Sequence, residues 1–223
     1  GNVNAVVINS KGDSLSTRFI TGDKALLGEL SMDNWTFEDA ELGVYDTEQL
    51  SRLLGVLDDD VTLNLTSSGD KAISVEISDA LSKVNFMLSD KSVINTPPAL
   101  KQLPEFEVSI KVDSNFIQRF ISGKSALPDT DTFTVITDDD EVKLVIGYSS
   151  INTNRVTIPV ETIEHSNIEN VSFNANLFKD VLVANKECES ATLEVSEGGL
   201  SRINFKVDDY DVTYYLVAVQ DVD

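Results

Sequence analysis

The sequence contains one cysteine, one histidine and one tryptophan among its 223 residues. The lone Cys188 cannot form a disulfide within the chain, which favours a reducing compartment. The lone His165 excludes a metal site built on two histidines. No apolar run reaches the length of about 18 residues that a membrane-spanning helix needs, and no glycine-rich phosphate loop is present.

Basic residues are also scarce, because 17 Lys and Arg face 38 Asp and Glu, a formal net charge of -21. Such a chain repels nucleic acid at long range. Either the acidic surface serves solubility, or the few cations are placed where they act. The acidic clusters 58–60 and 138–141 lack the ligand spacing of calcium loops and predict solvated turns. We expect no enzymatic activity, no bound metal and no cofactor.

A strand–helix–strand–strand–strand pattern begins at Ala40. Asp46 follows the first strand as a helix cap, and Gln49 three residues later completes a capping-box pattern. The expected apolar face of the helix consists of Leu50, Leu53, Leu54 and Leu57. Alternating apolar residues predict strands at 61–65, 72–77 and 83–88, with Val61, Leu63, Leu65, Ile73, Val75 and Ile77 directed inward.

The same pattern occurs twice more. In the second copy, Asp113 caps a helix expected to end at Gly123, between strands at 106–112, 131–137, 142–148 and 155–160. In the third, Asn174 or Asn176 caps a helix between strands at 171–173, 191–195, 201–207 and 212–219. The cap and the hairpin turn lie at positions 46 and 69, 113 and 139, and 174 and 198. This nearly constant spacing indicates an internal repeat.

Residues 1–37 predict only the second half of this unit, a hairpin followed by one strand. We expect the first strand and the helix of a fourth copy to lie before Gly1. Four copies form two pairs, which predicts an N-terminal domain at 1–88 and a C-terminal domain at 106–223. The linker at 89–105 contains three prolines and no helical periodicity.

Three stretches in this order carry a family resemblance: "VYDTEQLSRLLGVLDDD" (44–60), "PEFEVSIKVDSNFIQRF" (104–120) and "VTYYLVAV" (212–219). With their spacing, they resemble the DNA polymerase processivity clamps of T-even-like bacteriophages, within the PCNA-like clamp superfamily. The resemblance covers the chain from about residue 3. It implies an α+β fold, the DNA-clamp fold, with two similar domains of antiparallel sheets and helices on one face, here with the N-terminal helix missing.

The resemblance further implies a homotrimeric ring that encircles duplex DNA in the cytoplasm of an infected bacterium. Its partners would be double-stranded DNA, the replicative DNA polymerase, an ATP-driven clamp loader and late-transcription factors, and no membrane. The alternative hypothesis for the same composition is an acidic, β-rich viral structural or adaptor protein without a DNA function.

Cations on the helices are the candidate DNA-facing residues. Arg52 and Arg119 each lie six residues after a helix cap and project away from the apolar helix face, as Lys179 does on the third helix. The full candidate set is Arg52, Arg119, Lys179, Lys124, Lys186 and Lys111. Such cations would contact phosphates without reading bases. The ordinary alternative is that they belong to solvated helix faces.

A second candidate site is apolar. Clamps accept partner peptides beside the interdomain linker and the C-terminal segment, so the resemblance implies a peptide pocket formed by Val93, Ile94, Pro97, Leu100, Val217, Ala218 and Val219. The alternative is that these residues pack the linker onto the domains.

Overall fold

The computed structural model describes residues 3–58, 60–98, 100, 102–138, 141–151, 153–188 and 190–219. The chain forms two compact units. Unit 1 comprises Gly1–Gly22 and Glu29–Pro98, and unit 2 comprises Asp23–Gly28 and Ala99–Asp223. The predicted turn residues Asp59, Asp139 and Asp140, and the linker residues Ala99 and Lys101, lie outside the described residues.

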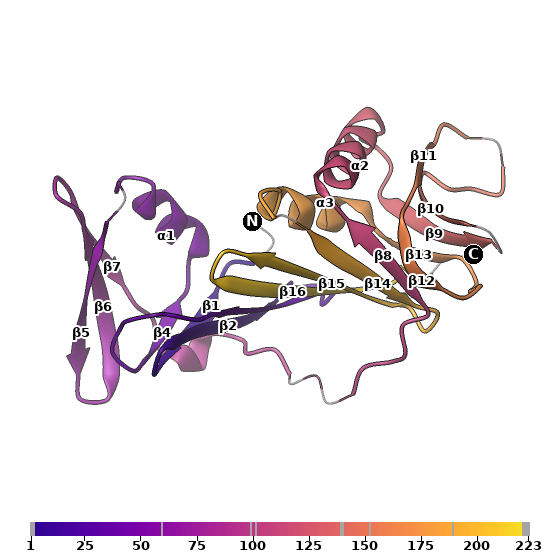
Figure 1. Ribbon diagram of the computed structural model, residues 1–223. Helices are drawn as coiled ribbons and strands as arrows, with labels where there is room; N and C mark the ends of the chain where they lie inside the picture. Colours follow the sequence, from indigo (N-terminus) through magenta and orange to yellow (C-terminus); the bar gives the residue numbers. More distant parts are fainter. Residues whose placement is uncertain are drawn as a thin grey trace. The chain divides into compact units, whose positions relative to one another are not determined.

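Unit 1 is built from antiparallel strands and one α-helix (Figure 1). Its elements are β1 (Val6–Lys11), β2 (Ser14–Ile20), β3 (Leu26–Met32, whose first residues belong to unit 2), β4 (Ala40–Val44), α1 (Thr47–Leu54), β5 (Thr62–Ser68), β6 (Lys71–Ser78), β7 (Lys83–Met87) and the 3₁₀ turn η1 (Lys91–Val93). Strand β1 pairs with β2 and β4, and β6 pairs with β5 and β7.

Unit 2 contains two complete copies of the repeat (Figure 1). Its elements are β8 (Val108–Val112), α2 (Ser114–Ala126), β9 (Thr132–Asp138), β10 (Glu141–Ile146), β11 (Val156–Pro159), β12 (Thr162–His165), β13 (Val171–Asn174), α3 (Ala175–Ala184), β14 (Ala191–Ser196), β15 (Leu200–Val207) and β16 (Tyr210–Val217). One sheet has the order β11-β10-β9-β13, and β12-β8-β14-β15-β16 are successive neighbours in the other.

The predicted repeat is confirmed, and so are its helix caps. The Asp46 carboxylate accepts a hydrogen bond from the Gln49 amide at 2.7 Å. Asp113 accepts one from the Phe116 amide at 2.8 Å. The Asn174 side chain caps α3, which settles the choice between two asparagines. Each cap satisfies backbone donors that the first turn of a helix leaves unpaired.

The two copies in unit 2 exchange their first strands. Strand β8 begins the second copy but pairs with β14 of the third, and β13 begins the third copy but pairs with β9 of the second. Each sheet of unit 2 therefore contains strands of both copies, so that neither copy can complete its own sheet.

An aromatic cluster fills the interior of unit 2. Phe116 and Phe120 of α2 meet Phe178 of α3, and the Phe120 and Phe178 ring centroids lie 4.8 Å apart. Phe133 of β9 lies 5.2 Å from Phe120 and 4.8 Å from Phe178, and Phe173 of β13 extends the cluster. Aromatic rings at these distances stabilise the fold by more than the burial of their apolar surface alone. The cluster joins both copies and holds α2 beside α3.

Gly123 does not end its helix, contrary to the prediction. Helix α2 continues to Ala126, and Gly123 is buried inside it. A Cβ atom at this position would lie 3.0 Å from Val156 Cγ1 and 3.2 Å from Ile146 Cδ1. The glycine therefore permits close packing of α2 on β10 and β11, which sequence periodicity does not reveal.

Three apolar residues of unit 1, Leu54, Val61 and Ile73, were predicted to face the core but are exposed. Leu54 is 42% exposed, and α1 has no fully buried residue. Ile73 is 37% exposed because the β5–β6 pairing shifts register between Thr66 and Ser67, which leaves Ile73 as the extra residue of a bulge. Val61 is exposed and lies outside β5. In unit 2, strand β12, which pairs with β8, is an element that the sequence did not predict.

Gly43 of β4 lies against the segment that follows β7. The Ser89 amide donates to the Gly43 carbonyl at 2.8 Å. A Cβ at Gly43 would lie 2.2 Å from the Ser89 carbonyl oxygen, a backbone atom, and 3.4 Å from Ile94 Cδ1. Only glycine permits this approach.

We predict that Gly43→Ala lowers the free energy of unfolding by about 1–3 kcal/mol, because the 88–94 segment must move away from β4. Denaturant unfolding of the full chain measures the change. Gly22→Ala is the matched control, because a Cβ there meets no atom within 4 Å. Equal effects of the two substitutions would contradict the packing argument.

Candidate nucleic-acid interface

Helix α2 presents a polar face that carries no acidic residue. Its sequence, SNFIQRFISGKSA, has neither Asp nor Glu. The exposed residues of this helix are Ser114, Asn115, Gln118, Arg119, Ser122, Ser125 and Ala126. In Figure 1, α2 and α3 lie side by side on one side of the strands of unit 2. The aromatic cluster beneath them leaves these polar residues on the outer surface of α2.

Charge is distributed unevenly between the helices and the rest of the chain. The three α-helices carry four of the 17 basic residues but only two of the 38 acidic ones. The acidic pair is Glu48 on α1 and Asp180 on α3. The helices are thus net positive in a chain of net charge -21, so they repel a polyanion less than the acidic surfaces do.

Arg119 is oriented on α2 by an uncharged partner and forms no ion pair with a carboxylate among the described residues. Its Nε donates to Asn115 Oδ1 at 3.1 Å, one helical turn earlier. Arg119 and Lys111 line the same hollow of about 260 Å³ beside α2. The Lys111 ammonium lies 3.2 Å from a Glu161 carboxylate oxygen. Arg119 therefore keeps its charge available to an external anion, whereas Lys111 is partly neutralised.

The other predicted cations differ in exposure. Arg52 is exposed on α1 and lies 3.3 Å from Glu48, an ion pair of the kind that contributes little in water. Lys179 is half-buried on α3, and Lys186 is exposed just beyond the end of that helix. Of the six predicted cations, Arg119 and Lys111 line one hollow together, with Asp113 and Glu161.

Lys124 requires a correction, because it is 3% exposed and does not lie on the polar face. Its ammonium donates to the carbonyl oxygens of Pro128, at 2.9 Å, and Leu127, at 3.4 Å. These carbonyls follow the end of α2, where cations are favoured by the helix dipole. Lys124 completes the end of the helix and is not available to DNA.

The residues predicted for the partner-peptide pocket fall into both units, and each is described within its own. In unit 1, Ile94 and Pro97 are buried, whereas Val93 is exposed. In unit 2, Leu100, Val217 and Val219 are exposed, and Ala218 is half-buried. The pocket itself stays a prediction.

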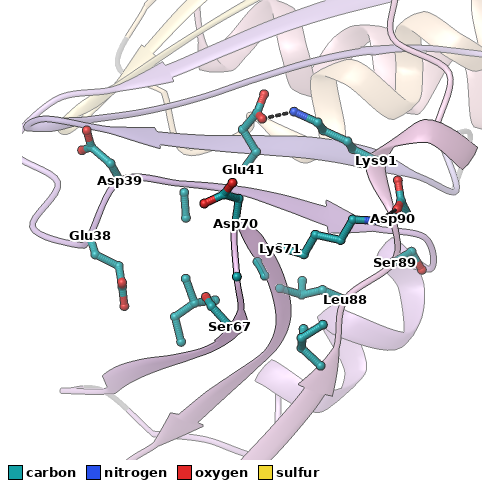
Figure 2. A pocket seen from close by; sticks show the side chains of 15 residues that line it. Glu38, Asp39, Glu41, Ser67, Asp70, Lys71, Leu88, Ser89, Asp90 and Lys91 are labelled. Atoms are coloured by element: carbon teal, nitrogen blue, oxygen red, sulfur yellow. Dashed lines mark hydrogen bonds and ion pairs between the residues drawn. The ribbon is translucent and has the colours of Figure 1, made fainter.

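A different hollow lies entirely within unit 1, between β4 and the β5–β6 hairpin, and we call it the hairpin groove (Figure 2). It measures about 640 Å³. Its lining residues are Glu38, Asp39, Ala40, Glu41, Leu65, Ser67, Gly69, Asp70, Lys71, Ala72, Ile73, Leu88, Ser89, Asp90 and Lys91. Lys91 pairs with Glu41, and Lys71 Nζ lies 2.7 Å from Asp90 Oδ2.

Within the described ranges, no group of three or more His, Cys, Asp or Glu side chains could hold a metal ion. No helix in that same part of the chain is long and apolar enough to cross a membrane. Cys188 is buried, and His165 Nε2 lies 3.3 Å from the Asp138 carbonyl.

Solved structures decide the fold. Proliferating Cellular Nuclear Antigen (PCNA) from Entamoeba histolytica aligns over 98% of this chain and 91% of its own, with a TM-score of 0.77 and 17% identity. A. fulgidus PCNA, solved with the C-terminal region of FEN-1 bound, aligns over 99% and 91%, with a TM-score of 0.79 and 14% identity. The chain has the PCNA-like DNA clamp fold. No protein-family profile and no curated protein matches the sequence.

Two features of these surfaces escaped the sequence reasoning. The sequence analysis did not identify the uncharged polar residues around Arg119 as part of the surface. The absence of Asp and Glu across 114–126 could have indicated them in so acidic a chain. The hairpin groove was missed because it depends on how β4, the β5–β6 hairpin and the segment after β7 pack together, which the alternating pattern does not show.

The Lys71–Asp90 pair makes a pH-dependent contribution to stability. The hydrogen bond from Lys71 and the Ser92 amide hold the pKa of Asp90 well below its ordinary value of 3.8. A carboxyl group with a lowered pKa stabilises the fold above its unfolded pKa and loses that contribution as the pH falls toward its folded pKa.

We predict that wild type melts at a higher temperature than Asp90→Asn at pH 5–7, and that the difference shrinks as the pH falls from 4 toward 2. Thermal melts across this range measure it. Asp70→Asn on the same hairpin leaves the Lys71–Asp90 pair intact and is the control. A difference that does not change with pH would contradict the assignment.

Proposed function

We propose that this chain is the subunit of a sliding clamp that encircles duplex DNA. The PCNA-like fold supports the proposal, and one observation carries it: the three helices together carry four basic residues and only two acidic ones in a strongly acidic chain. Helices facing duplex DNA would meet phosphates with Arg119, Lys179 and uncharged polar groups. Such contacts read no sequence, as sliding requires.

An acidic exterior is compatible with this role. A ring retains DNA by enclosing it, so strong phosphate contacts would only slow movement along the duplex. Acidic surfaces elsewhere keep DNA from binding outside the ring. No step in this function needs a reacting side chain, and the protein would act as a tether without chemistry of its own.

Ring closure is supported by two unlike edges. In unit 1, β7 ends the β5-β6-β7 order and packs beside α1, and in unit 2, β11 ends the β11-β10-β9-β13 order and packs beside α2. Unpaired strand edges invite pairing with another chain. Pairing β7 of one copy with β11 of the next would continue the sheet and place α1 beside α2. Because the two surfaces differ, the contact would be head-to-tail, which forms a ring when the rotation between successive copies closes. We propose three subunits.

The exposed apolar residues of unit 1 fit this arrangement. Leu54 and Val56 at the end of α1, and Met87 on β7, are exposed in the single chain. Apolar surface grouped beside a free strand edge is typical of an interface. Contact with a neighbouring copy would bury it.

The finer parts of the proposal come from the sequence resemblance. We propose that the ring tethers the replicative DNA polymerase of a T-even-like phage, is opened by a clamp loader and supports late transcription in the cytoplasm of the infected bacterium. Partner tails would bind at the predicted pocket that includes Val93, Leu100 and Val217. The complex of A. fulgidus PCNA with the C-terminal region of FEN-1 supports peptide tails as ligands of this fold.

Light scattering across a concentration series tests the ring, with an expected mass near three times 24.4 kDa. We predict that Thr157→Pro shifts the protein to 24.4 kDa. Thr157 is exposed on β11. The Val160 amide, three residues later, donates toward β10. Because amides along a strand point alternately to its two sides, the Thr157 amide points away from β10. Thr157→Val keeps the amide and should keep the assembly. A wild-type monomer at high concentration would contradict the ring and favour the acidic adaptor.

Arg119 and Lys124 are predicted to show opposite behaviour. Arg119→Ala should lower the slope of log K against log salt for duplex DNA by about 0.9 while changing unfolding free energy by less than about 0.5 kcal/mol. Lys124→Met should leave the slope unchanged and lower stability by about 1–3 kcal/mol, because the Leu127 and Pro128 carbonyls beyond the end of α2 lose their donor.

Fluorescence anisotropy with a labelled duplex and denaturant unfolding measure the two quantities. Lys206→Ala, an exposed cation on β15, is the control for a general charge effect. A slope that responds equally to Arg119→Ala and Lys206→Ala would contradict a DNA-facing role for α2.

A further inference from the structure

The hairpin groove exists because the β5–β6 hairpin is longer than its counterpart in unit 2. In both units the segment after the last strand bonds to the hairpin and to the first strand. Leu88 N donates to the Ile73 carbonyl in unit 1, as Ala218 N does to Gly199 in unit 2, each at 2.8 Å. In unit 2 the hairpin turns at this level, whereas in unit 1 it continues to the turn at Gly69. The extra length forms one wall of the groove.

The floor of the groove is apolar and is fixed by the core. Ala40, Leu65, Ala72 and Leu88 line the groove and also pack against the buried cluster of Leu42, Val75 and Ile77. The bulge leaves Ile73 exposed beside them. An apolar side chain entering here would extend an existing core rather than create a new one.

The other wall offers backbone groups. The Gly43 carbonyl accepts a hydrogen bond from the Ser89 amide, so the backbone N–H and C=O of Gly43 point away from β1. Glu41 lies two residues earlier in the strand, so its backbone N–H and C=O point the same way. The chain leaves this edge at Asp90, where η1 begins. The edge of β4 at Glu41 is therefore open to a strand that continues the ladder begun by Ser89.

Charge selects the kind of strand. Five carboxylates and two lysines line the groove. Both lysines are already paired, Lys71 with Asp90 and Lys91 with Glu41, and Asp39 accepts from the Gly12 amide at 2.8 Å. Among the described residues, Glu38 and Asp70 form no ion pair. Figure 2 shows Glu38 at the end of the groove away from η1.

We propose that the hairpin groove binds an extended peptide segment of a partner protein in which apolar residues alternate with Lys or Arg. The apolar side chains occupy the floor, the backbone pairs with β4 at Glu41, and the cations meet Glu38 and Asp70. Addition of a strand to an open edge is a recurring mode of peptide recognition. None of the residues predicted for the linker-side peptide pocket lines this groove.

Anisotropy of a fluorescein-labelled, terminally blocked octapeptide of alternating leucine and lysine tests the proposal at physiological salt. Saturable binding is expected, and substitution of alanine for leucine in the probe should weaken it at least about tenfold. A probe with glutamate for lysine should not bind. These two probes separate the floor from the charge.

The protein variant E38K/D70K should weaken the leucine–lysine probe at least about tenfold, whereas D129K/E164K, which makes the same charge change at exposed positions in unit 2, should weaken it less than about twofold. All four residues are exposed, and thermal melts verify that both variants fold. Amide chemical shifts should change chiefly in residues 38–41 and 65–73.

The absence of saturable binding would overturn the proposal. So would equal weakening by the two variants, which would mean that the probe responds only to the overall negative charge. A change in solution mass of E38K/D70K, with unaltered probe binding, would assign the groove to contact between copies of the chain and would equally overturn it.

Discussion

The packing of five phenylalanine rings between the two copies of unit 2 is the interaction on which the candidate DNA surface depends. Phe120 and Phe178, with centroids 4.8 Å apart, hold α2 against α3, and Phe133 ties both to a sheet that contains strands of each copy. Because the apolar sides of the helices are engaged inward, the polar residues of α2 are directed outward. The position of Arg119 is thus a consequence of the core.

Local signals made most of the fold predictable. Asp46, Asp113 and Asn174 act on amides within three residues, so their roles as caps are written in short stretches of sequence. The hairpins follow from alternation and turn residues, and the repeat adds consistency because three copies show the same order. The fold class was predicted from the family resemblance, which rests on the order and spacing of such stretches.

The wrong predictions have a different origin, since each depends on packing or backbone geometry that residue periodicity does not show. The sequence around Gly123 predicts a helix end, but the glycine lies inside α2, where Val156 and Ile146 leave little room for a side chain. Lys124 has the sequence position of a surface cation, but the turn at Pro128 folds back and binds it. The alternation of apolar residues predicts that Ile73 faces the core, but the bulge shifts the register of the strand at this position. Of the six candidate cations, Lys124 is buried, and the DNA-facing role of the other five stays a prediction.

The exchange of first strands in unit 2 has a consequence for the order of events during synthesis. Strand β8 emerges from the ribosome well before β14, its partner in the third copy, and β9 must likewise await β13. Until then, the second copy has an incomplete sheet and its phenylalanines lack Phe173 and Phe178. Non-local pairing of this kind slows folding and leaves apolar surface exposed to aggregation. A nascent chain of this design is vulnerable until its final hundred residues or so are complete, and its numerous carboxylates help to keep such chains apart through mutual repulsion.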